Sequence, residues 1–182
     1  MNSVERDRDR ELWDRAVAFH GHSCPGLAIG YKAALYARDL LDLQYSEDEE
    51  VVCVTENDAC GVDAISVVLG CSVGKGNLLF RLRGKQAFSF FNRKTGKRVR
   101  LVMRDIPKQG KTREEVQREM LNTPQDRLFD LKEPSFALPE GARIFTSLIC
   151  EGCGEKTAEN HIRLQEGKTV CLDCFSAYSR FI

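Results

Sequence analysis

The stretch AFHGHSCPGLAIG, residues 18–30, carries the most unusual chemistry of the chain and begins its central helix. It places two of the three histidines and one of the eight cysteines within five residues, beside two glycines and a proline. Proline suits the first turn of a helix, and residues 27–43 are rich in Ala and Leu. We therefore predict a largely buried helix over 27–43, entered through a loop that holds His20, His22 and Cys24.

The segments around this helix alternate between helical and extended patterns. Apolar periodicity predicts helices over 11–19, 60–69 and 112–122, the last with a capping box formed by Thr112 and Glu115. Runs rich in β-branched and aromatic residues predict strands at 51–55 and within 77–84, 86–93 and 97–105. We predict an α+β fold, with helices packed on a mostly antiparallel sheet.

Composition excludes several classes of protein. The 182 residues carry 27 Lys and Arg against 27 Asp and Glu, so no overall field would recruit nucleic acid or a membrane. The densely charged N-terminus lacks the apolar segment of a secretory signal, and Lys32, Arg38 and Asp39 interrupt the longest apolar run. We predict a cytoplasmic protein that contacts no membrane.

A proline-containing segment divides the chain in two. Residues 132–141 contain Pro134 and Pro139 and show no helical or strand pattern. We predict a core domain over 1–135, a linker over 136–144 and a small module over 145–182.

Four cysteines in this module have the spacing of a structural zinc site. Two C-x-x-C pairs, Cys150 with Cys153 and Cys171 with Cys174, are separated by 17 residues. Two disulfides or two redox-active pairs are the alternatives. We predict a treble-clef-like zinc finger with a hairpin at 161–170 that carries His161 on its surface, and a helix over 172–181.

A second group of metal-binding side chains is expected in the core. In an extended loop, His20, His22 and Cys24 would point the same way. Cys60 begins the next predicted helix, so both segments can meet at one pocket with the acids Glu56, Asp58 and Asp63. The alternative is that these are capping and buried core groups, as Cys53 on its apolar strand is expected to be. Cys71, eleven residues after Cys60, would lie ~16 Å from it along a continuous helix and cannot share its ion.

Three further patterns have two interpretations each. The GKGN stretch at 74–77 is either a backbone cradle for phosphate or a tight turn. The nine Lys or Arg between 81 and 104 form either a basic binding face or a solvated sheet face balanced by acids elsewhere, and we favour the second. Phe88, Phe90 and Phe91 are expected in the core and in dimer packing.

FHGHSCPGLAIGYKAA (19–34) and CGVDAISVVLGCSVGKGNL (60–78) together resemble the FmdE family of formylmethanofuran dehydrogenase proteins. The resemblance implies an α+β core, a C-terminal zinc finger as in some members, and an intertwined homodimer. It marks as functional His20, His22, Cys24, Cys60, Asp63, Cys71, Gly74, Lys75, Gly76 and Asn77. Ser72 stands where the family pattern has threonine. The finger resembles those of small bacterial transcription regulators that bind RNA polymerase.

These observations support hypotheses from three classes. The first is a metal-binding protein with a structural zinc and a second transition metal in the core, which senses or delivers metal or regulates genes of anaerobic C1 metabolism. Its finger would contact protein or nucleic acid. The second is a metal-dependent enzyme in which the core residues act on a small anionic substrate, with Asp58 or Asp63 as the acid–base group and Lys75 as the anchor. The third is a dimerisation scaffold without a core site.

Overall fold

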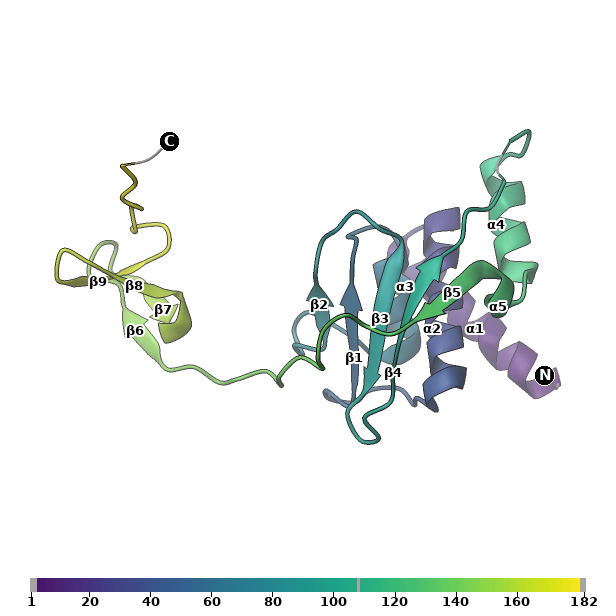
Figure 1. Ribbon diagram of the computed structural model, residues 1–182, viewed down its shortest axis with the longest axis horizontal. Coiled ribbons are helices and arrows are strands. Elements are labelled where there is room, and N and C mark those ends of the chain that lie inside the picture. The colour runs from purple at the N-terminus through teal and green to yellow at the C-terminus, as the bar shows by residue number, and fades with distance from the viewer. Residues whose placement is uncertain (1–2, 108, 181–182) are drawn as a thin grey trace. The chain divides into compact units, whose positions relative to one another are not determined.

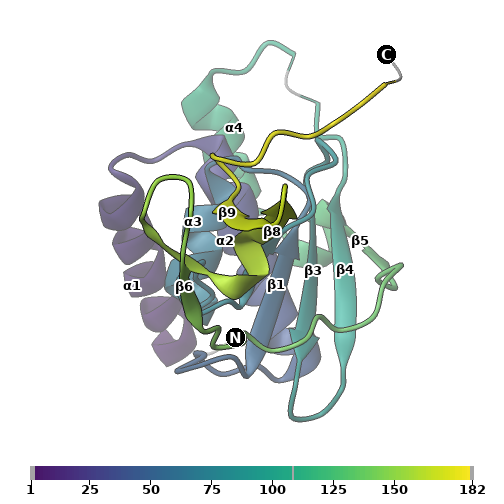
Figure 2. The ribbon, with the colours of Figure 1, turned by 90° about the vertical axis from the view of Figure 1, so that its left-hand side faces the viewer.

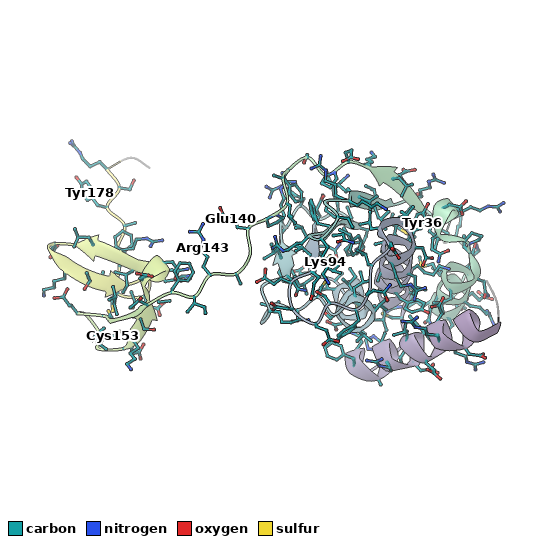
Figure 3. All side chains as sticks on the ribbon, turned by 90° about the horizontal axis from the view of Figure 1, so that it is seen from below. Tyr36, Lys94, Glu140, Arg143, Cys153 and Tyr178 are labelled. Atoms are coloured by element: carbon teal, nitrogen blue, oxygen red, sulfur yellow. The ribbon has the colours of Figure 1, made fainter. Side chains whose placement is uncertain are left out.

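The computed structural model describes residues 3–107 and 109–180. The chain divides between Ala142 and Arg143 into two units, a core and a finger. Figure 3 labels Glu140 and Arg143 on the segment that joins them. None of the described helices is both long enough and apolar enough to cross a bilayer.

A five-stranded sheet forms the centre of the core (Figure 1). Its order is β2-β1-β3-β4-β5. Only the β1–β2 pair is parallel, and the other three pairs are antiparallel, which confirms the predicted mostly antiparallel sheet. The strands are β1 Val51–Thr55, β2 Leu78–Phe80, β3 Ala87–Asn92, β4 Arg98–Met103 and β5 Phe129–Lys132.

Helices cover one face of this sheet (Figure 2). They are α1 Ser3–His20, α2 Pro25–Leu41, α3 Gly61–Leu69, α4 Arg113–Asn122 and α5 Gln125–Leu128. Helix α1 starts well before the predicted Glu11. The predicted capping box of Thr112 and Glu115 is confirmed at the start of α4.

Helix α2 is the central buried element, as predicted. Its residues Leu27, Ala33, Ala34 and Ala37 have no exposed surface and share one apolar cluster with Phe88 and Phe90 of β3. Small alanines let the helix lie close to the sheet. Phe91, on the opposite sheet face, is also buried, so the core prediction for the three phenylalanines is confirmed.

A strap over residues 133–142 covers the second face of the sheet. Phe136 packs on Phe91 with ring centroids 5.8 Å apart, and the Arg81 guanidinium lies over the Phe136 ring. Arg93 donates to the Pro139 carbonyl at 2.8 Å. Much of the segment predicted as linker is therefore packed against the core.

Carboxylates pair with several of the nine basic residues between 81 and 104. Glu49, Glu133, Glu56 and Asp130 bind, in that order, Arg93, Arg98, Arg100 and Arg104. These pairs support the interpretation of the run as a sheet face balanced by acids.

The finger consists of two hairpins with a 3₁₀ turn between them. The elements are β6 Ser147–Ile149, β7 Lys156–Ala158, η1 Glu159–His161, β8 Ile162–Gln165 and β9 Lys168–Cys171. The hairpin predicted at 161–170 is confirmed as β8 and β9, and His161 is exposed on η1. The helix predicted over 172–181 is wrong: residues 175–179 have no regular structure, and Tyr178 is 85% exposed. A helix of that length is marginal in water unless it packs against another element, and Tyr178 packs on none of those described.

Candidate metal centre

Three metal-binding side chains converge where α1 ends and α2 begins. His20 is the last residue of α1, Gly21 turns the chain with φ of +89°, and Cys24 is the N-cap of α2. One donor atom from each of His20, His22 and Cys24 lies within 4.8 Å of the others. Donors around one tetrahedral ion lie about 3.3–3.8 Å apart, given bond lengths of about 2.0–2.3 Å. Small side-chain movements would complete a site.

His20 is held in the orientation that a metal ligand requires. Its Nδ1 lies 2.7 Å from Oδ2 of Asp63, in the first turn of α3. In a neutral imidazole whose Nδ1–H binds a carboxylate, Nε2 carries the free electron pair. This Nε2 is buried and has no hydrogen-bond partner within the described part of the chain. A histidine between a carboxylate and an open donor position is the arrangement found at many metal centres.

Glycines allow α2 and α3 to approach closely enough to bring Cys60 beside Cys24. A Cβ atom at Gly30 would lie 1.9 Å from the Gly61 carbonyl oxygen, and one at Gly61 would lie 3.0 Å from the Gly26 oxygen. Cys60 immediately precedes α3, and a Cβ at Gly26 would lie 3.5 Å from its sulfur and 3.9 Å from the Cys24 sulfur. The glycines of GLAIG and of Cys60-Gly61 were a signal for this contact that the sequence interpretation missed.

The thiol environments differ across the core. Burial, the hydrogen bond with Cys24 and the negative charge of a Cys24 thiolate raise the pKa of Cys60. The Cys24 sulfur accepts the Leu27 N–H at 3.3 Å. Cys53 and Cys71 are fully buried, and desolvation raises the pKa of Cys71 to about 12. The interpretation of Cys53 as a buried core residue is confirmed.

Two other predicted groups are engaged elsewhere. Glu56 is 2% exposed and binds Arg100 through both oxygens, at 2.6 and 3.0 Å, so its assignment to the pocket is wrong. The Lys75 amine donates to the Ser46 carbonyl at 2.6 Å and lies over the Tyr45 ring. Its role as an anion anchor stays a prediction. Asp58 is exposed.

The GKGN segment has a structural role at the start of β2. Asn77 is fully buried, and its amide donates to the carbonyls of Val51 and Asp48 at 2.9 and 3.0 Å. Its side-chain oxygen accepts the Ser72 N–H at 2.9 Å. These bonds tie the loop before β1 to the loop before β2, which favours the tight-turn interpretation.

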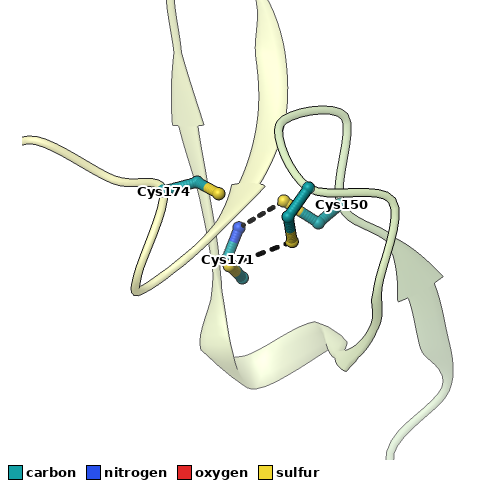
Figure 4. Close-up of side chains that lie close together, drawn as sticks. Cys150, Cys171 and Cys174 are labelled. Carbon is teal, nitrogen blue, oxygen red and sulfur yellow. Dashed lines mark hydrogen bonds between the residues drawn. The ribbon is translucent and has the colours of Figure 1, made fainter.

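The four finger cysteines form the second cluster. The ligand atoms of Cys150, Cys153, Cys171 and Cys174 lie within 4.8 Å of one another, and all eight cysteines are free thiols. Figure 4 shows Cys150, Cys171 and Cys174 pointing toward a common centre. A Cβ at Gly152 would lie 2.9 Å from the Cys174 sulfur, so the first pair requires glycine there.

Backbone amides prepare one of these sulfurs for metal binding. The Cys171 N–H donates to the Cys150 sulfur at 3.2 Å, and the Gly152 N–H lies at 3.4 Å. Backbone hydrogen bonds, chiefly from Cys153 and Cys171, lower the pKa of Cys150 to about 6. Hydrogen bonds with the other three thiols raise the pKa of Cys174 to about 12. Zinc would replace these hydrogen bonds between thiols by binding all four sulfurs as thiolates.

The fold and its two cysteine-containing clusters define a class: an α+β metal-binding protein with a C-terminal four-cysteine zinc finger. A family model described as "FmdE, Molybdenum formylmethanofuran dehydrogenase operon" matches residues 19–133, and the chain belongs to this family. A second model, the prokaryotic dksA/traR C4-type zinc finger, matches residues 143–180.

Two individual proteins are similar to most of this chain. An Archaeoglobus fulgidus protein named "Probable S-adenosyl-L-methionine-binding protein" is 28% identical over 196 residues, which cover 90% of this chain. The match spans 52% of that relative, about half its length. The crystal structure of a "tungsten formylmethanofuran dehydrogenase subunit e (fmde)-like protein" from Syntrophus aciditrophicus shares the fold. Its TM-score is 0.58 at 23% identity, over 91% of each chain.

Proposed function

We propose that this FmdE-family protein binds a second transition-metal ion through His20, His22 and Cys24, and that it senses or delivers this metal or uses it in regulation. The supporting observation is the buried, unpartnered Nε2 of His20 beside two other donors. An orphaned buried acceptor costs free energy unless a ligand satisfies it. His22 is exposed, so an ion held there can exchange with solution, as sensing or delivery requires.

The nitrogen and sulfur donors of the core site limit which metal ions it would bind. Two imidazoles and one thiolate suit zinc, cobalt, nickel or copper better than magnesium or calcium, which prefer oxygen ligands. Asp63 would fix the tautomer and the ring orientation of His20.

The finger would link the metal state to a partner. Residues 143–180 carry five Lys or Arg and five Asp or Glu, which gives no electrostatic preference for nucleic acid. Ile144, Ile149 and Leu164 are 103%, 54% and 73% exposed. We favour a protein partner over nucleic acid, with the zinc in a purely structural role because four thiolates leave no open position.

Metal analysis of the purified full chain tests the core site. We expect two metal ions per chain in the wild type and one in His20→Gln and in Cys24→Ser. Matched controls are His161→Gln, an exposed histidine of the finger, and Cys53→Ala, a buried thiol of the sheet. Both controls should retain two ions.

One ion in the wild type after reconstitution with zinc, cobalt, nickel and copper would contradict the proposal. Two ions in both His20→Gln and Cys24→Ser would contradict it equally. With zinc in the finger and cobalt in the core, a thiolate-to-cobalt absorption band that disappears in Cys24→Ser places the core ion at that sulfur.

A metal-dependent enzyme of anaerobic C1 metabolism is the second candidate. Three protein donors leave a fourth position for water or a small anionic substrate, and the exposed His22 leaves the site accessible. The two candidates differ in exchange and turnover. Sensing or delivery requires rapid transfer of the core ion to a chelator, whereas an enzyme retains the ion and converts substrate.

We also propose that the protein forms a homodimer, as the family resemblance implies, and that it acts in the cytoplasm. Sedimentation equilibrium of the full chain at several concentrations tests the dimer. A mass equal to that of one chain throughout would contradict it.

A further inference from the structure

The Cys24 sulfur belongs to two groups of side chains at once. It is one of the three clustered donors, and it lies beside Cys60. A Cβ at Gly26 would lie 3.9 Å from the Cys24 sulfur and 3.5 Å from the Cys60 sulfur, so both sulfurs border one small space. Cys60 itself lies outside the three-donor group.

We propose that Cys24 and Cys60 form a disulfide when the protein meets a hydroperoxide, and that this modification releases the core metal ion. The metal half of the inference rests on the function proposed above. The disulfide half rests on the thiol pair alone.

The two thiols are prepared for different parts of the reaction. The Cys24 sulfur caps the N-terminus of α2 and accepts the Leu27 N–H at 3.3 Å, and helix N-termini are positions where reactive cysteines commonly lie. Cys60 is half-buried, and its sulfur borders the same space as that of Cys24. In the proposed reaction Cys24 is therefore the attacking group and Cys60 the resolving group.

The chemistry balances with hydrogen peroxide as the hydroperoxide, and an organic hydroperoxide would release an alcohol in place of the first water. The Cys24 thiolate attacks one peroxide oxygen, the O–O bond breaks, and the leaving hydroxide takes a proton to become water. The Cys60 sulfur then displaces the oxygen from the Cys24 sulfenic acid, and its proton leaves with that oxygen as the second water. The thiols lose two electrons, which the peroxide gains.

Burial limits the reaction to this pair within the core. Cys60 is partly exposed and Cys24, at 4% exposure, borders the same space, whereas Cys53 and Cys71 have no exposed surface. Oxidation depends on thiolate character and access, so the two buried thiols should resist it. A disulfide would remove the only thiolate among the three clustered donors, leaving His20 and His22. Two imidazoles alone hold a transition metal weakly.

Peptide mapping of the full chain tests the disulfide. Cleavage by trypsin gives a peptide of residues 16–32 whose one cysteine is Cys24. It gives a second peptide of residues 39–75 that contains Cys53, Cys60 and Cys71. After treatment with hydrogen peroxide and blocking of free thiols, we expect a cross-linked species of these two peptides in the wild type. Cys60→Ser should abolish it, and the matched Cys53→Ala variant should retain it. The finger cysteines fall in other peptides.

Metal release is measured in the same samples with a chromogenic chelator, and Cys24→Ser, which retains only the finger ion, provides the baseline. We expect release of one ion above this baseline for each cross-link formed. A wild-type chain in which Cys24 stays free or becomes sulfinic acid, with no cross-link, would overturn the inference. So would a cross-link that leaves two ions bound. If the wild-type protein holds only one ion before oxidation, the proposed function is contradicted instead. The presence or absence of the cross-link then still tests whether Cys24 and Cys60 form a disulfide.

Discussion

The Nδ1 atom of His20 lies 2.7 Å from Oδ2 of Asp63, although 43 positions separate the two residues in the sequence. One residue ends α1, and the other lies in the first turn of α3. The contact orients the imidazole so that its Nε2 remains free and buried. Asp63 is therefore a positioning residue for the proposed metal centre rather than one of its three clustered donors.

Replacing Asp63 by Asn should weaken metal binding in the core without removing it. A neutral amide no longer stabilises the imidazole as a carboxylate does, and loss of such a partner typically lowers metal affinity about 10–100-fold. Competition against a chelator of known affinity measures the change. Asp58→Asn, at an exposed position nearby, is the control and should leave affinity unchanged. Equal affinities in the two variants would remove the positioning role.

Replacing Gly30 by Ala should destabilise the core and disturb the site. The new methyl group would lie 1.9 Å from the Gly61 oxygen, and both partners are backbone atoms of packed helices. Overpacking of this kind costs about 1–3 kcal/mol or more, and we expect the upper end of this range because no flexible side chain can yield. Urea unfolding of Gly30→Ala measures it. Gly74→Ala, where nothing lies within 4 Å, is the matched control. Similar midpoints for the two variants would refute the proposed close helix contact.

Local patterns were sufficient to predict most elements of the core. The alanine-rich stretch at 27–43, the β-branched run at 51–55 and the Thr112 capping box each depend on neighbours in sequence, and each appears where predicted. Strand β5 was missed because its four residues follow directly on the short helix α5. Four residues are too few to show the apolar–polar alternation that identifies a strand.

Tertiary contacts account for what the sequence could not predict. The partner of Glu56 is Arg100, 44 positions away on β4, and no local pattern distinguishes that arrangement from a place in the pocket. The helix expected after Cys171 does not form in the described residues up to 180, because propensity alone does not hold a short helix without a packing surface. By contrast, the convergence of His20, His22 and Cys24 depends only on a short loop, which is why spacing could anticipate it.

Replacing Glu56 by Gln should destabilise the fold most strongly near neutral pH. Hydrogen bonds with Arg100 lower the pKa of Glu56 below its usual value. The ionised carboxylate therefore stabilises the native state above the unfolded pKa of about 4.3, and this contribution is lost as the pH falls through the lowered pKa. The Arg100 side chain is 15% exposed, so loss of its partner leaves a nearly buried charge, and we expect a cost of about 2–4 kcal/mol.

Urea unfolding of wild type and Glu56→Gln at pH 7 and at about pH 3 measures this difference, which should shrink toward the acid end. Glu133→Gln is the control, because Glu133 forms an exposed pair with Arg98, and such pairs contribute about 0–1 kcal/mol. A Glu56→Gln effect that is no larger than that of the control at pH 7, or that does not decrease in acid, would contradict the prediction.

Replacing Cys153 by Ser should remove the finger zinc and unfold the finger while the core remains folded. The finger is a separate unit, and its buried apolar cluster contains little beyond Val170 and the zinc-site cysteines Cys150 and Cys171. So small a module depends on its metal for folding. Amide hydrogen exchange should therefore show loss of protection in 147–171 and unchanged protection in α2 and β3. His161→Gln is the control: its imidazole binds Asn160 and lies outside the cysteine cluster, so that variant should keep its zinc and its protection. Zinc loss in His161→Gln would make the histidine a ligand, and retained protection in Cys153→Ser would show that the finger folds without its metal.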